Sequence, residues 1–456
     1  MTQNSINPAT GVCFEEYASL NEGQIRAALA DATAAFESWR ELSFTARAKP
    51  LLRAAELLEQ DADRYGRLMA EEMGKPVGEG RAEAGKSAWV CRYYADNGAR
   101  FLAPEPVETE AARSLVTFRP LGPVLAIMPW NFPFWQVFRA AAPALMAGNT
   151  MLLKHAANVP GCSLEIERIF TAAGLPEAVF QSLLVGSDRV ADLIGDPAIR
   201  GVTLTGSTPA GRAVASSAGR HLKPCVLELG GSDPYVVLGD ADVAAAAEVC
   251  VTSRLINTGQ SCIAAKRFIV VDNVREEFEA EVVRRMAAIT WGDPSEPGSD
   301  IGPLARTDLR DSLHDQVARS VAAGARCLLG GTNPGGPGAF YPPTVLTDVQ
   351  PGNPAYEEEL FGPVAAILPV ADDEAAIETA NDSSFGLGAA VFTSDPVRGE
   401  RIATDRLEAG CCFVNDFVRS DPRLPFGGIK DSGFGRELSQ FGIREFVNVK
   451  TVVVAA

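Results

Sequence analysis

The sequence predicts an α/β protein with more than one domain. A chain of 456 residues is too long for one compact core and favours roughly two to three domains. After Gly122, short apolar runs alternate with segments of helical spacing, which is typical of parallel strands buried on both faces of a sheet. A content of 46% hydrophobic and 22% charged residues is that of an ordinary globular protein. We therefore expect a cleft between domains, where small-molecule chemistry usually takes place.

The expected elements follow one another along the chain. Apolar residues recur at helical spacing from about Glu22 to Met73 and predict paired amphipathic helices. After Gly122, strands are expected at 124–128, 150–153 and 201–205, with a helix at 161–173. A second α/β unit follows Gly231. Its expected strands are 235–238, 267–271 and 365–368, its helices include 275–288, and a Gly- and Pro-rich loop at 330–343 leads to a strand at 344–346.

Charge and composition exclude several classes of partner. The formal net charge of −17 provides no basic surplus for nucleic acid or an anionic membrane. No stretch reaches the ~18 apolar residues of a membrane span, and the first residues lack a basic and apolar leader, so we expect a cytoplasmic protein. The nine cysteines include no CxxC pair and the three histidines form no HExxH cluster, so we expect reduced thiols and no metal site.

Residues 80–87, Gly-Arg-Ala-Glu-Ala-Gly-Lys-Ser, match the phosphate-binding loop pattern GxxxxGK[ST]. Such a loop needs a buried strand directly before its first glycine, but residues 73–79 do not read as one. Glu83 would also place a carboxylate inside a loop that must hold phosphates. We expect a helix here, and a triphosphatase is a remote alternative.

A different segment is a better candidate for binding a phosphate. No strict GxGxxG is present, but residues 201–211 read as a strand, a tight turn at Gly206 and Ser207, and a helix with Pro209 in its first turn. This arrangement directs free N–H groups and the positive end of a helix dipole at an anion. Ordinary packing of a helix on a strand produces a similar pattern.

Cys262 is the candidate nucleophile. A buried apolar thiol is the usual role of a cysteine, but the polar lead-in Thr258-Gly259-Gln260-Ser261 indicates a loop that delivers the thiol to a cleft. A thiol nucleophile needs an oxyanion donor and a base. Asn131, in Trp130-Asn131-Phe132-Pro133, and Glu228, in Glu228-Leu229-Gly230-Gly231, interrupt apolar sequence and are the candidates.

These segments, in this order, resemble the aldehyde dehydrogenase superfamily over essentially the whole chain. Further matching segments are Asn7-Pro8-Ala9-Thr10-Gly11, Gly259-Gln260-Ser261-Cys262, Glu359-Leu360-Phe361-Gly362-Pro363 and Pro425-Phe426-Gly427-Gly428. Segments 153–158 and 418–423 look most like the bacterial NAD(P)-dependent succinate-semialdehyde dehydrogenases.

The resemblance implies a fold and a domain organisation. It implies a Rossmann-like cofactor domain, an α/β catalytic domain and a small β arm for oligomerisation. The implied boundaries are 1–103 and 121–228 for the cofactor domain, 229–424 for the catalytic domain, 104–120 and 441–456 for the arm, and 425–440 for a return to the cofactor domain. The β-branched tail would be an exposed edge unless it pairs with another chain, so a homodimer or a dimer of dimers is expected.

The resemblance also implies a mechanism. The Cys262 thiolate attacks the aldehyde carbon, and the Asn131 amide and the Cys262 backbone N–H hold the alkoxide as an oxyanion hole does. Hydride transfer to the nicotinamide leaves a thioester, and Glu228 activates the water that hydrolyses it.

The cofactor residues are assigned by the same resemblance. Lys154 would contact the adenosine ribose, Trp130 the cofactor wall, and Glu359 with Phe361 the nicotinamide ribose. Further expected contacts are Gly206 and Ser207 at the pyrophosphate, and Gly211 and Leu229. NAD-preferring relatives often carry a glutamate three residues after the lysine, where this chain has Ala157, so NADP is expected to be preferred over NAD. Without the resemblance, Lys154 could be a surface lysine at a helix end and Glu359 part of a solvated acidic run.

A semialdehyde that ends in a carboxylate needs a cation at the far end of its pocket. The resemblance places a carboxylate-binding arginine eight residues after Asn131, at Arg139, and Arg419, Ser420 and Phe426 are the other expected pocket residues. The alternative for Arg139 is a surface partner on the helix after Pro133. Arg254 is a weaker candidate because it could satisfy backbone carbonyls instead. Cys411 and Cys412 have no assigned role beyond packing.

Oxidation of succinate semialdehyde to succinate is therefore the leading hypothesis. Another aldehyde, such as glutarate semialdehyde, lactaldehyde or an aromatic aldehyde, is the alternative within the same chemistry. From other classes, a triphosphatase and a non-enzymatic protein that keeps the fold stay open.

Overall fold

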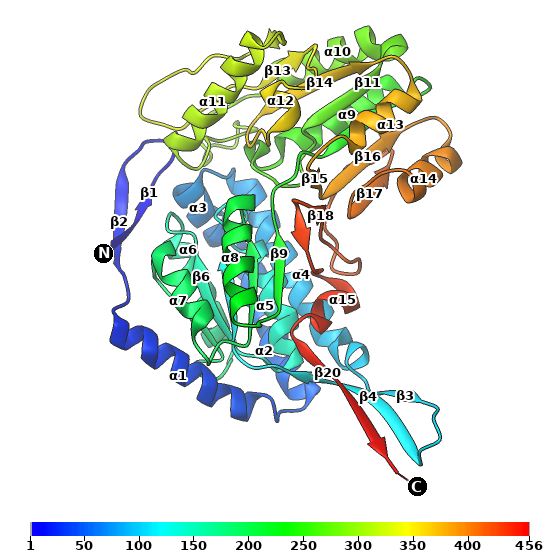
Figure 1. Ribbon diagram of the computed structural model, residues 1–456. Coiled ribbons are helices and arrows are strands. Elements are labelled where there is room, and N and C mark those ends of the chain that lie inside the picture. The colour runs from blue at the N-terminus through cyan, green and yellow to red at the C-terminus, as the bar shows by residue number, and fades with distance from the viewer. Residues whose placement is uncertain (1, 456) are drawn as a thin grey trace.

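Two α/β lobes and a projecting arm make up the computed structural model, which describes residues 2–455 (Figure 1). The first lobe lies in the lower part of Figure 1 and is built around a six-stranded sheet in the order β19-β9-β8-β5-β6-β7. All of its strands are parallel except β19, which pairs antiparallel with β9. The strands are β5 (Val124–Met128), β6 (Met151–His155), β7 (Phe180–Ser182), β8 (Gly201–Thr205), β9 (Cys225–Glu228) and β19 (Gly433–Phe434).

Helices cover both faces of this sheet. Residues of α2 to α6 pack with Val124, Ala126 and Met128 of β5 on one face. Residues of α1, α7 and α8 pack with Leu125 and Ile127 on the other. The helices are α1 (Glu22–Trp39), α2 (Phe44–Gln60), α3 (Ala62–Met73), α4 (Val77–Phe101), α5 (Trp135–Ala147), α6 (Pro160–Ala172), η1 (Ser187–Arg189), α7 (Val190–Gly195), α8 (Thr208–Arg220) and α15 (Ser439–Arg444). An antiparallel hairpin of β1 (Thr2–Ile6) and β2 (Cys13–Ala18) precedes α1.

The second lobe has a seven-stranded sheet in the order β12-β13-β14-β11-β10-β16-β17, parallel except for β12. Its strands are β10 (Pro234–Val237), β11 (Arg267–Val271), β12 (Arg326–Leu329), β13 (Thr344–Thr347), β14 (Val364–Val370), β16 (Gly388–Phe392) and β17 (Cys411–Val414). Its helices are α9 (Val243–Leu255), η2 (Ile256–Gly259), α10 (Asp272–Ala287), α11 (Thr307–Ala322), α12 (Pro354–Glu357), α13 (Asp373–Asn381) and α14 (Pro396–Asp405). The short strands β15 (Phe385–Gly386) and β18 (Ile429–Lys430) pair beside it.

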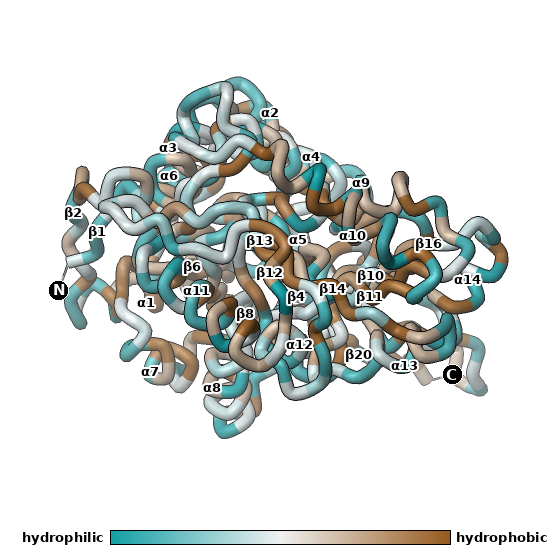
Figure 2. The backbone as a smooth tube through the Cα atoms, turned by 90° about the horizontal axis from the view of Figure 1, so that it is seen from above, coloured by the Kyte–Doolittle hydropathy of each residue, from teal (hydrophilic) through white to brown (hydrophobic). Residues whose placement is uncertain are grey.

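Burial explains why the strands could be read from the sequence. Every residue of β5, β6, β8, β10 and β11 is buried, so both faces of these strands are covered and no regular alternation of apolar and polar residues appears. Figure 2 shows the hydrophobic colour along strands such as β8 and β11, whereas outer segments are mixed or hydrophilic. The expected α/β class, the expected strands and the helices at 22–73, 161–173 and 275–288 are confirmed to within a few residues.

The segment with the phosphate-loop pattern is helical, as expected. Residues 80–87 lie inside α4, which has 25 residues and begins at Val77. The triphosphatase alternative therefore lacks the strand and loop that its mechanism requires.

The arm is a three-stranded antiparallel sheet in the order β20-β4-β3, at the lower right of Figure 1. Its strands are β3 (Glu105–Val107), β4 (Arg113–Pro120) and β20 (Val447–Val454). The expectation that the second arm segment begins at residue 441 is wrong. Residues 439–444 form α15 instead, because Ile443, which is 1% exposed, packs into the core of the first lobe.

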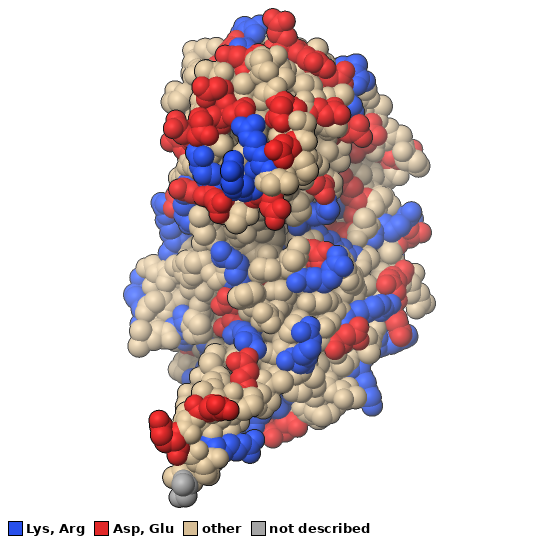
Figure 3. Space-filling view, turned by 90° about the vertical axis from the view of Figure 1, so that its right-hand side faces the viewer, with Lys and Arg blue, Asp and Glu red and all other residues tan. Residues whose placement is uncertain are grey.

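The distribution of charged side chains on the surface agrees with the expectation that the chain has no basic surplus for nucleic acid. On the face in Figure 3, acidic and basic side chains are interspersed, and the basic groups are bordered by acidic ones. Within residues 2–455, no helix is both long and apolar enough to cross a membrane.

Candidate active site

The candidate residues of the first lobe come from one edge of its sheet. The chain leaves β5 toward β6 on one side and returns to β8 on the other, so the strand order reverses between β5 and β8. Ligands of open α/β sheets bind at the carboxyl ends of the strands near such a reversal. Trp130 follows β5, Lys154 is the last residue but one of β6, Gly206 follows β8, and Glu228 ends β9.

The second lobe contributes residues that precede its strands. Cys262 lies between η2 and β11, and Glu359 with Phe361 lies between α12 and β14. The Trp130 and Phe361 rings meet edge to face with centroids 5.8 Å apart, which brings the two sets of residues together across the cleft. This contact, and the hydrogen bonds of Asn131 to the loop before Cys262, bring Trp130 and Asn131 of the first lobe to the second lobe.

The loop that leads to Cys262 has an unusual backbone. Asn257, Thr258 and Gly259 have φ values of 54°, 56° and 75°, in the left-handed region. A β-branched residue such as threonine rarely adopts this conformation, which costs on the order of 1–3 kcal/mol. At Gly259 any Cβ would overlap the carbonyl group of Gly362. The glycine in the lead-in to the thiol is therefore required for packing as well as for its φ.

Contacts from distant segments hold this loop in place. The Asn257 backbone N–H donates to the Glu79 carboxylate of α4 at 2.8 Å, and the Thr258 hydroxyl oxygen accepts from the Gly302 N–H at 3.1 Å. The Arg254 guanidinium donates to the Gly259 carbonyl at 2.6 Å. Arg254 thus satisfies a backbone carbonyl, which was the alternative to a role in substrate binding.

Lys266 fixes the backbone at the nucleophile itself. Its ammonium donates to the carbonyl oxygens of Ser261 and Cys262 at 2.9 and 2.7 Å, and it lies 3.3 Å from the Glu359 carboxylate. Burial raises the pKa of the Cys262 thiol to about 12, while the positive charges of Lys266 and Arg139 act in the opposite direction. The thiol is protonated in this state, so its attack requires removal of a proton.

Asn131 lies against the same loop. Its side-chain N–H group donates to the Gln260 backbone carbonyl at 3.1 Å, and the backbone carbonyl of Asn131 accepts from the side-chain amide of Asn257 at 2.7 Å. The amide nitrogen has two hydrogens, so one stays free to donate to an oxygen on the substrate. Glu83 of α4 supports the following residues by accepting from the N–H groups of Phe134 and Trp135.

Glu228 is a buried carboxyl group without a hydrogen-bond partner. Its side chain is 2% exposed, and neither carboxyl oxygen is bonded to another group within residues 2–455. Burial, together with the nearby negative charge of Glu437, raises its pKa well above the usual range. A Cβ at Gly427 would lie 2.7 Å from the carboxyl oxygen, so this glycine gives Glu228 its space. A carboxyl group with these properties can serve as a general base.

The turn at Gly206 and Ser207 has the geometry of an anion site. Ser207 is the N-cap of α8, but its side chain makes no capping bond, so the first N–H groups of α8 are free of it. A Cβ at Gly211 would overlap the Leu229 side chain, which explains the small residue there. Gly211 and Leu229 therefore pack on each other behind the turn.

Neither Lys154 nor Glu359 is a solvated surface residue, which was the alternative interpretation of each. Lys154 is 9% exposed at the end of β6, and burial lowers its pKa. Ala157, three residues after Lys154, has no carboxylate that could bind the ribose 2′-hydroxyl. Glu359 accepts from the Gly231 N–H at 3.1 Å and pairs with Lys266, so it is not part of a solvated acidic run.

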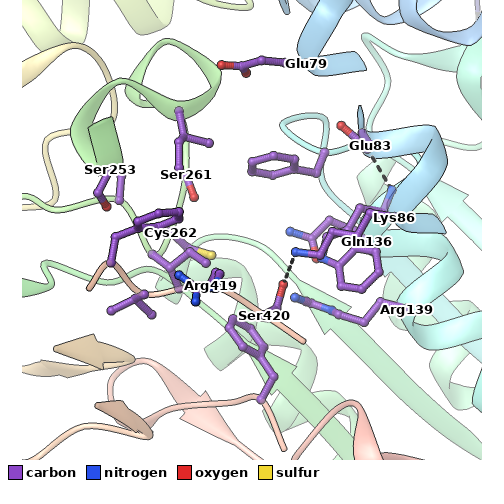
Figure 4. A pocket seen from close by; sticks show the side chains of 18 of the residues that line it. Glu79, Glu83, Lys86, Gln136, Arg139, Ser253, Ser261, Cys262, Arg419 and Ser420 are labelled. Carbon is purple, nitrogen blue, oxygen red and sulfur yellow. Dashed lines mark hydrogen bonds between the residues drawn. The ribbon is translucent and has the colours of Figure 1, made fainter. Parts of the chain in front are cut away.

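A pocket of about 350 Å³ opens beside Cys262 (Figure 4). Its walls are formed by helices α4 and α5, the loop of residues 257–262 that ends at Cys262 (the nucleophile loop), and the loop after β17. Its polar and charged lining residues are Glu79, Glu83, Lys86, Gln136, Arg139, Ser253, Ser261, Cys262, Arg419 and Ser420. Phe426 also lines it, so all four predicted substrate residues are in the wall.

The two predicted arginines are already paired with carboxylates. Arg139 is 2% exposed, forms an ion pair with Glu437, donates to the Thr205 hydroxyl at 3.2 Å and lies over the Phe426 ring. The surface alternative for Arg139 is therefore wrong. Arg419 pairs with Asp416 at 2.7 Å.

Lys86 is a pocket residue that the sequence analysis did not identify. In the sequence, Lys86 belongs only to the phosphate-loop pattern. The spacing of Glu79, Ala82, Glu83 and Lys86 places them on one face of a helix, and this face lines the pocket. That spacing was the signal that could have identified Lys86.

The described part of the chain has no group of three or more His, Cys, Asp or Glu side chains arranged to hold a metal ion. The half-buried Cys411 and Cys412 have thiol pKa values raised to about 12 and about 11 by desolvation. No contact gives the pair a role beyond packing.

Comparisons with known proteins agree with this geometry. The model of the aldehyde dehydrogenase family matches residues 1–452. The chain is 51% identical over 451 residues to a probable NADP(+) succinate-semialdehyde dehydrogenase of Synechocystis sp., covering 99% of both chains. It is 48% identical to an NAD(P)+ succinate semialdehyde dehydrogenase of Escherichia coli, covering 98% of this chain and 97% of the other. Among solved structures, succinic semialdehyde dehydrogenase from Streptococcus pyogenes in complex with NADP+ is similar with a TM-score of 0.97 and 35% identity, covering 100% of each chain.

Proposed function

The chain belongs to the aldehyde dehydrogenase family, and on that premise we propose that it oxidises succinate semialdehyde to succinate, with NADP preferred over NAD. The observation that carries the proposal is the pocket beside Cys262, which has a thiol in one wall and the cationic side chains Lys86, Arg139 and Arg419 in the others. A four-carbon aldehyde that ends in a carboxylate needs both features. Relatives named for this substrate, at 47 to 51% identity over nearly the whole chain, support the same choice.

In the proposed mechanism, the Cys262 thiol gives up its proton to solvent, and the thiolate forms the covalent bond to the aldehyde carbon. The free hydrogen of the Asn131 amide and the Cys262 backbone N–H donate to the oxygen that becomes an alkoxide. Because the loop from Asn257 to Gly259 is held by Glu79, Gly302 and Arg254, these donors are fixed before the substrate binds. Preorganised donors of this kind stabilise charge that develops in the transition state.

Glu228 is the proposed base for the second half of the reaction. The thioester on Cys262 must be hydrolysed, and a carboxylate near it can remove a proton from the attacking water. Its raised pKa makes the ionised form a stronger base than an exposed glutamate.

The residues of the cofactor site fit a dinucleotide with a 2′-phosphate. The N–H groups of α8 and the turn at Gly206 suit a pyrophosphate, and the cationic Lys154 beside Ala157 suits an added phosphate. When bound, the nicotinamide supplies the acceptor for the hydride that leaves the substrate carbon. Glu359 is held by the Gly231 N–H and Lys266, which leaves its second oxygen free for a ribose hydroxyl.

The arm supports assembly into a homodimer or a dimer of dimers. Within residues 2–455, β20 is bonded to β4 along one edge only, and Val449 and Val453 on it are 61% and 59% exposed. An open, β-branched edge strand pairs readily with another strand. Light scattering on the full chain and on a variant truncated after Phe446 would test this, and an unchanged mass after truncation would contradict it.

A coupled assay tests the proposed activity. We expect NADPH to appear with succinate semialdehyde at a kcat/KM well above that for lactaldehyde, glutarate semialdehyde and an aromatic aldehyde. Each aldehyde is tested with NADP and with NAD. A higher kcat/KM for one of the other aldehydes would overturn the substrate, and a higher kcat/KM with NAD would overturn the cofactor preference.

A further inference from the structure

Lys86 extends from α4 into the pocket that Cys262 borders. Its ammonium donates to the Ser420 hydroxyl oxygen at 2.8 Å and lies 4.4 Å from the centre of the Trp135 ring. Figure 4 shows Lys86 and the Cys262 sulfur on opposite sides of the pocket, with Ser420 next to Lys86. Because the lysine donates this bond, the proton of the Ser420 hydroxyl is free to be donated to a ligand.

The charges around the pocket distinguish Lys86 from the two arginines. Arg139 is neutralised by Glu437, and Arg419 by Asp416. Lys86 lies within ion-pair distance of no carboxylate among residues 2–455, although Glu83 and Asp421 are near enough to influence it. It is thus the pocket cation whose charge is not already balanced by a direct contact.

We propose that Lys86, and not Arg139, is the cation that binds the distal carboxylate of the semialdehyde, and that it orients Ser420 to donate to the same carboxylate. This inference rests on the proposed function, because it assumes a substrate with a carboxylate. Arg139 then has a different role. Its contacts with Glu437, Thr205 and Phe426 fix the wall of the pocket.

The electrostatics of the site support this assignment. Burial, together with the positive charges of Arg139 and Arg419, lowers the pKa of Lys86 to about 8, although Glu83 and Asp421 act in the opposite direction. A desolvated cation with little compensation gains more from an anionic ligand than an exposed one does. The carboxylate of the substrate would provide that compensation.

The test compares a charged and an uncharged aldehyde of the same chain length. Succinate semialdehyde and butanal are assayed with wild type, Lys86→Met, Lys86→Arg and Arg423→Met. Arg423 is the matched control. It lies three residues after Ser420, its guanidinium bonds Asp421, and its side chain is 67% exposed outside the pocket.

We expect Lys86→Met to raise KM for succinate semialdehyde about 10- to 100-fold, the range of a hydrogen bond to a charged group. KM for butanal should stay within about twofold, Lys86→Arg should restore part of the loss, and Arg423→Met should change neither substrate. Unchanged KM for succinate semialdehyde in Lys86→Met, or an equal loss on both aldehydes, would overturn the proposal. A wild type that does not prefer succinate semialdehyde to butanal would instead overturn the proposed function.

A second measurement does not depend on whether the variants fold. Trinitrobenzenesulfonate modifies uncharged lysine amines, and peptide mass spectrometry of the wild-type protein reports the modification of Lys86. Succinate should protect Lys86, whereas butyramide, which has the same chain length and no carboxylate, should not. Equal labelling with and without succinate would contradict binding of a carboxylate at Lys86.

Discussion

Glu228→Gln separates the two halves of the proposed reaction. Glutamine has nearly the same shape as glutamate but cannot accept a proton from water. Because Glu228 is 2% exposed and makes no hydrogen bond within residues 2–455, the substitution breaks no contact that holds the fold. General base catalysis contributes about 10²- to 10⁴-fold, so steady-state turnover should fall by that factor while the thioester still forms.

Rapid mixing with excess succinate semialdehyde and NADP measures both halves at once. We expect a burst of about one NADPH per active site, followed by a steady rate that is lower than that of the wild type. Mass spectrometry of the quenched protein should show the succinyl group on the peptide that contains Cys262. Cys262→Ala, as the control, should give neither burst nor adduct.

Two results would refute the reasoning. A steady rate equal to that of the wild type would show that Glu228 is not the base. Loss of the burst together with turnover would show that Glu228 acts before the thioester forms, for example on the Cys262 thiol.

The pH profile provides a further check, because only the ionised carboxyl accepts a proton and its pKa is raised by burial. Turnover limited by thioester hydrolysis should therefore rise with pH in the wild type, and the rise should be absent in Glu228→Gln.

Three further substitutions and one pH series extend the test. Ala157→Glu would place a carboxylate where the 2′-phosphate is proposed to bind. Because like charges about 4 Å apart repel strongly, the ratio of kcat/KM for NADP over NAD should fall about 100-fold or more. An unchanged ratio would contradict this location of the 2′-phosphate. Asn131→Ala should lower kcat about 100-fold or more with little change in KM, because it removes an oxyanion donor, and a KM effect alone would argue against that role. Leu222 is 92% exposed with φ at 53°, so Leu222→Gly should raise the free energy of unfolding by about 0.5–1 kcal/mol in urea, while Leu222→Ala should give no gain. Finally, the ratio of kcat/KM for succinate semialdehyde over butanal should fall as the pH rises through about 8, where Lys86 loses its proton. Ionisation of Cys262 affects both aldehydes equally and therefore cancels in this ratio. In Lys86→Arg the ratio should not change with pH, because the arginine keeps its charge.

The fold could be predicted because its central strands are buried on both faces. A run such as 267–271 contains no polar interruption except at its first residue, Arg267, and it is the strand β11 residue for residue. The start of the second arm segment was harder to predict. Residues 439–444 form α15 through contacts with α4 and α5, which are far away in the sequence and leave no local signal.

The proposed catalytic residues stand out in the sequence for a related reason. Asn131, Glu228 and Cys262 interrupt apolar sequence, and burying a polar side chain is costly unless it is paired or functional. Their surroundings could not be predicted. The left-handed backbone of Asn257 and Thr258 depends on Glu79 and Gly302, and the pairing of Arg139 depends on Glu437. A partner nearly 300 residues away, which removes the free charge of an arginine, cannot be read from the sequence around that arginine.

Helix α4 connects these distant segments through one of its faces. Glu79 binds the Asn257 N–H of the nucleophile loop, Glu83 binds the N–H groups that follow Asn131, and Lys86 binds Ser420 in the loop after β17. Residues spaced by four and then three positions point in one direction from a helix, so three loops of the active site are positioned from a single rigid surface. The match to a phosphate-binding loop arises because Gly80 stands three residues before Glu83 and Gly85 stands directly before Lys86. Gly80 has a separate physical cause, since a Cβ there would lie 2.8 Å from the Gly66 backbone of α3. The pattern therefore reflects the close packing of two helices and the charged face of one of them, and that face is the structural support for both the nucleophile loop and the substrate pocket.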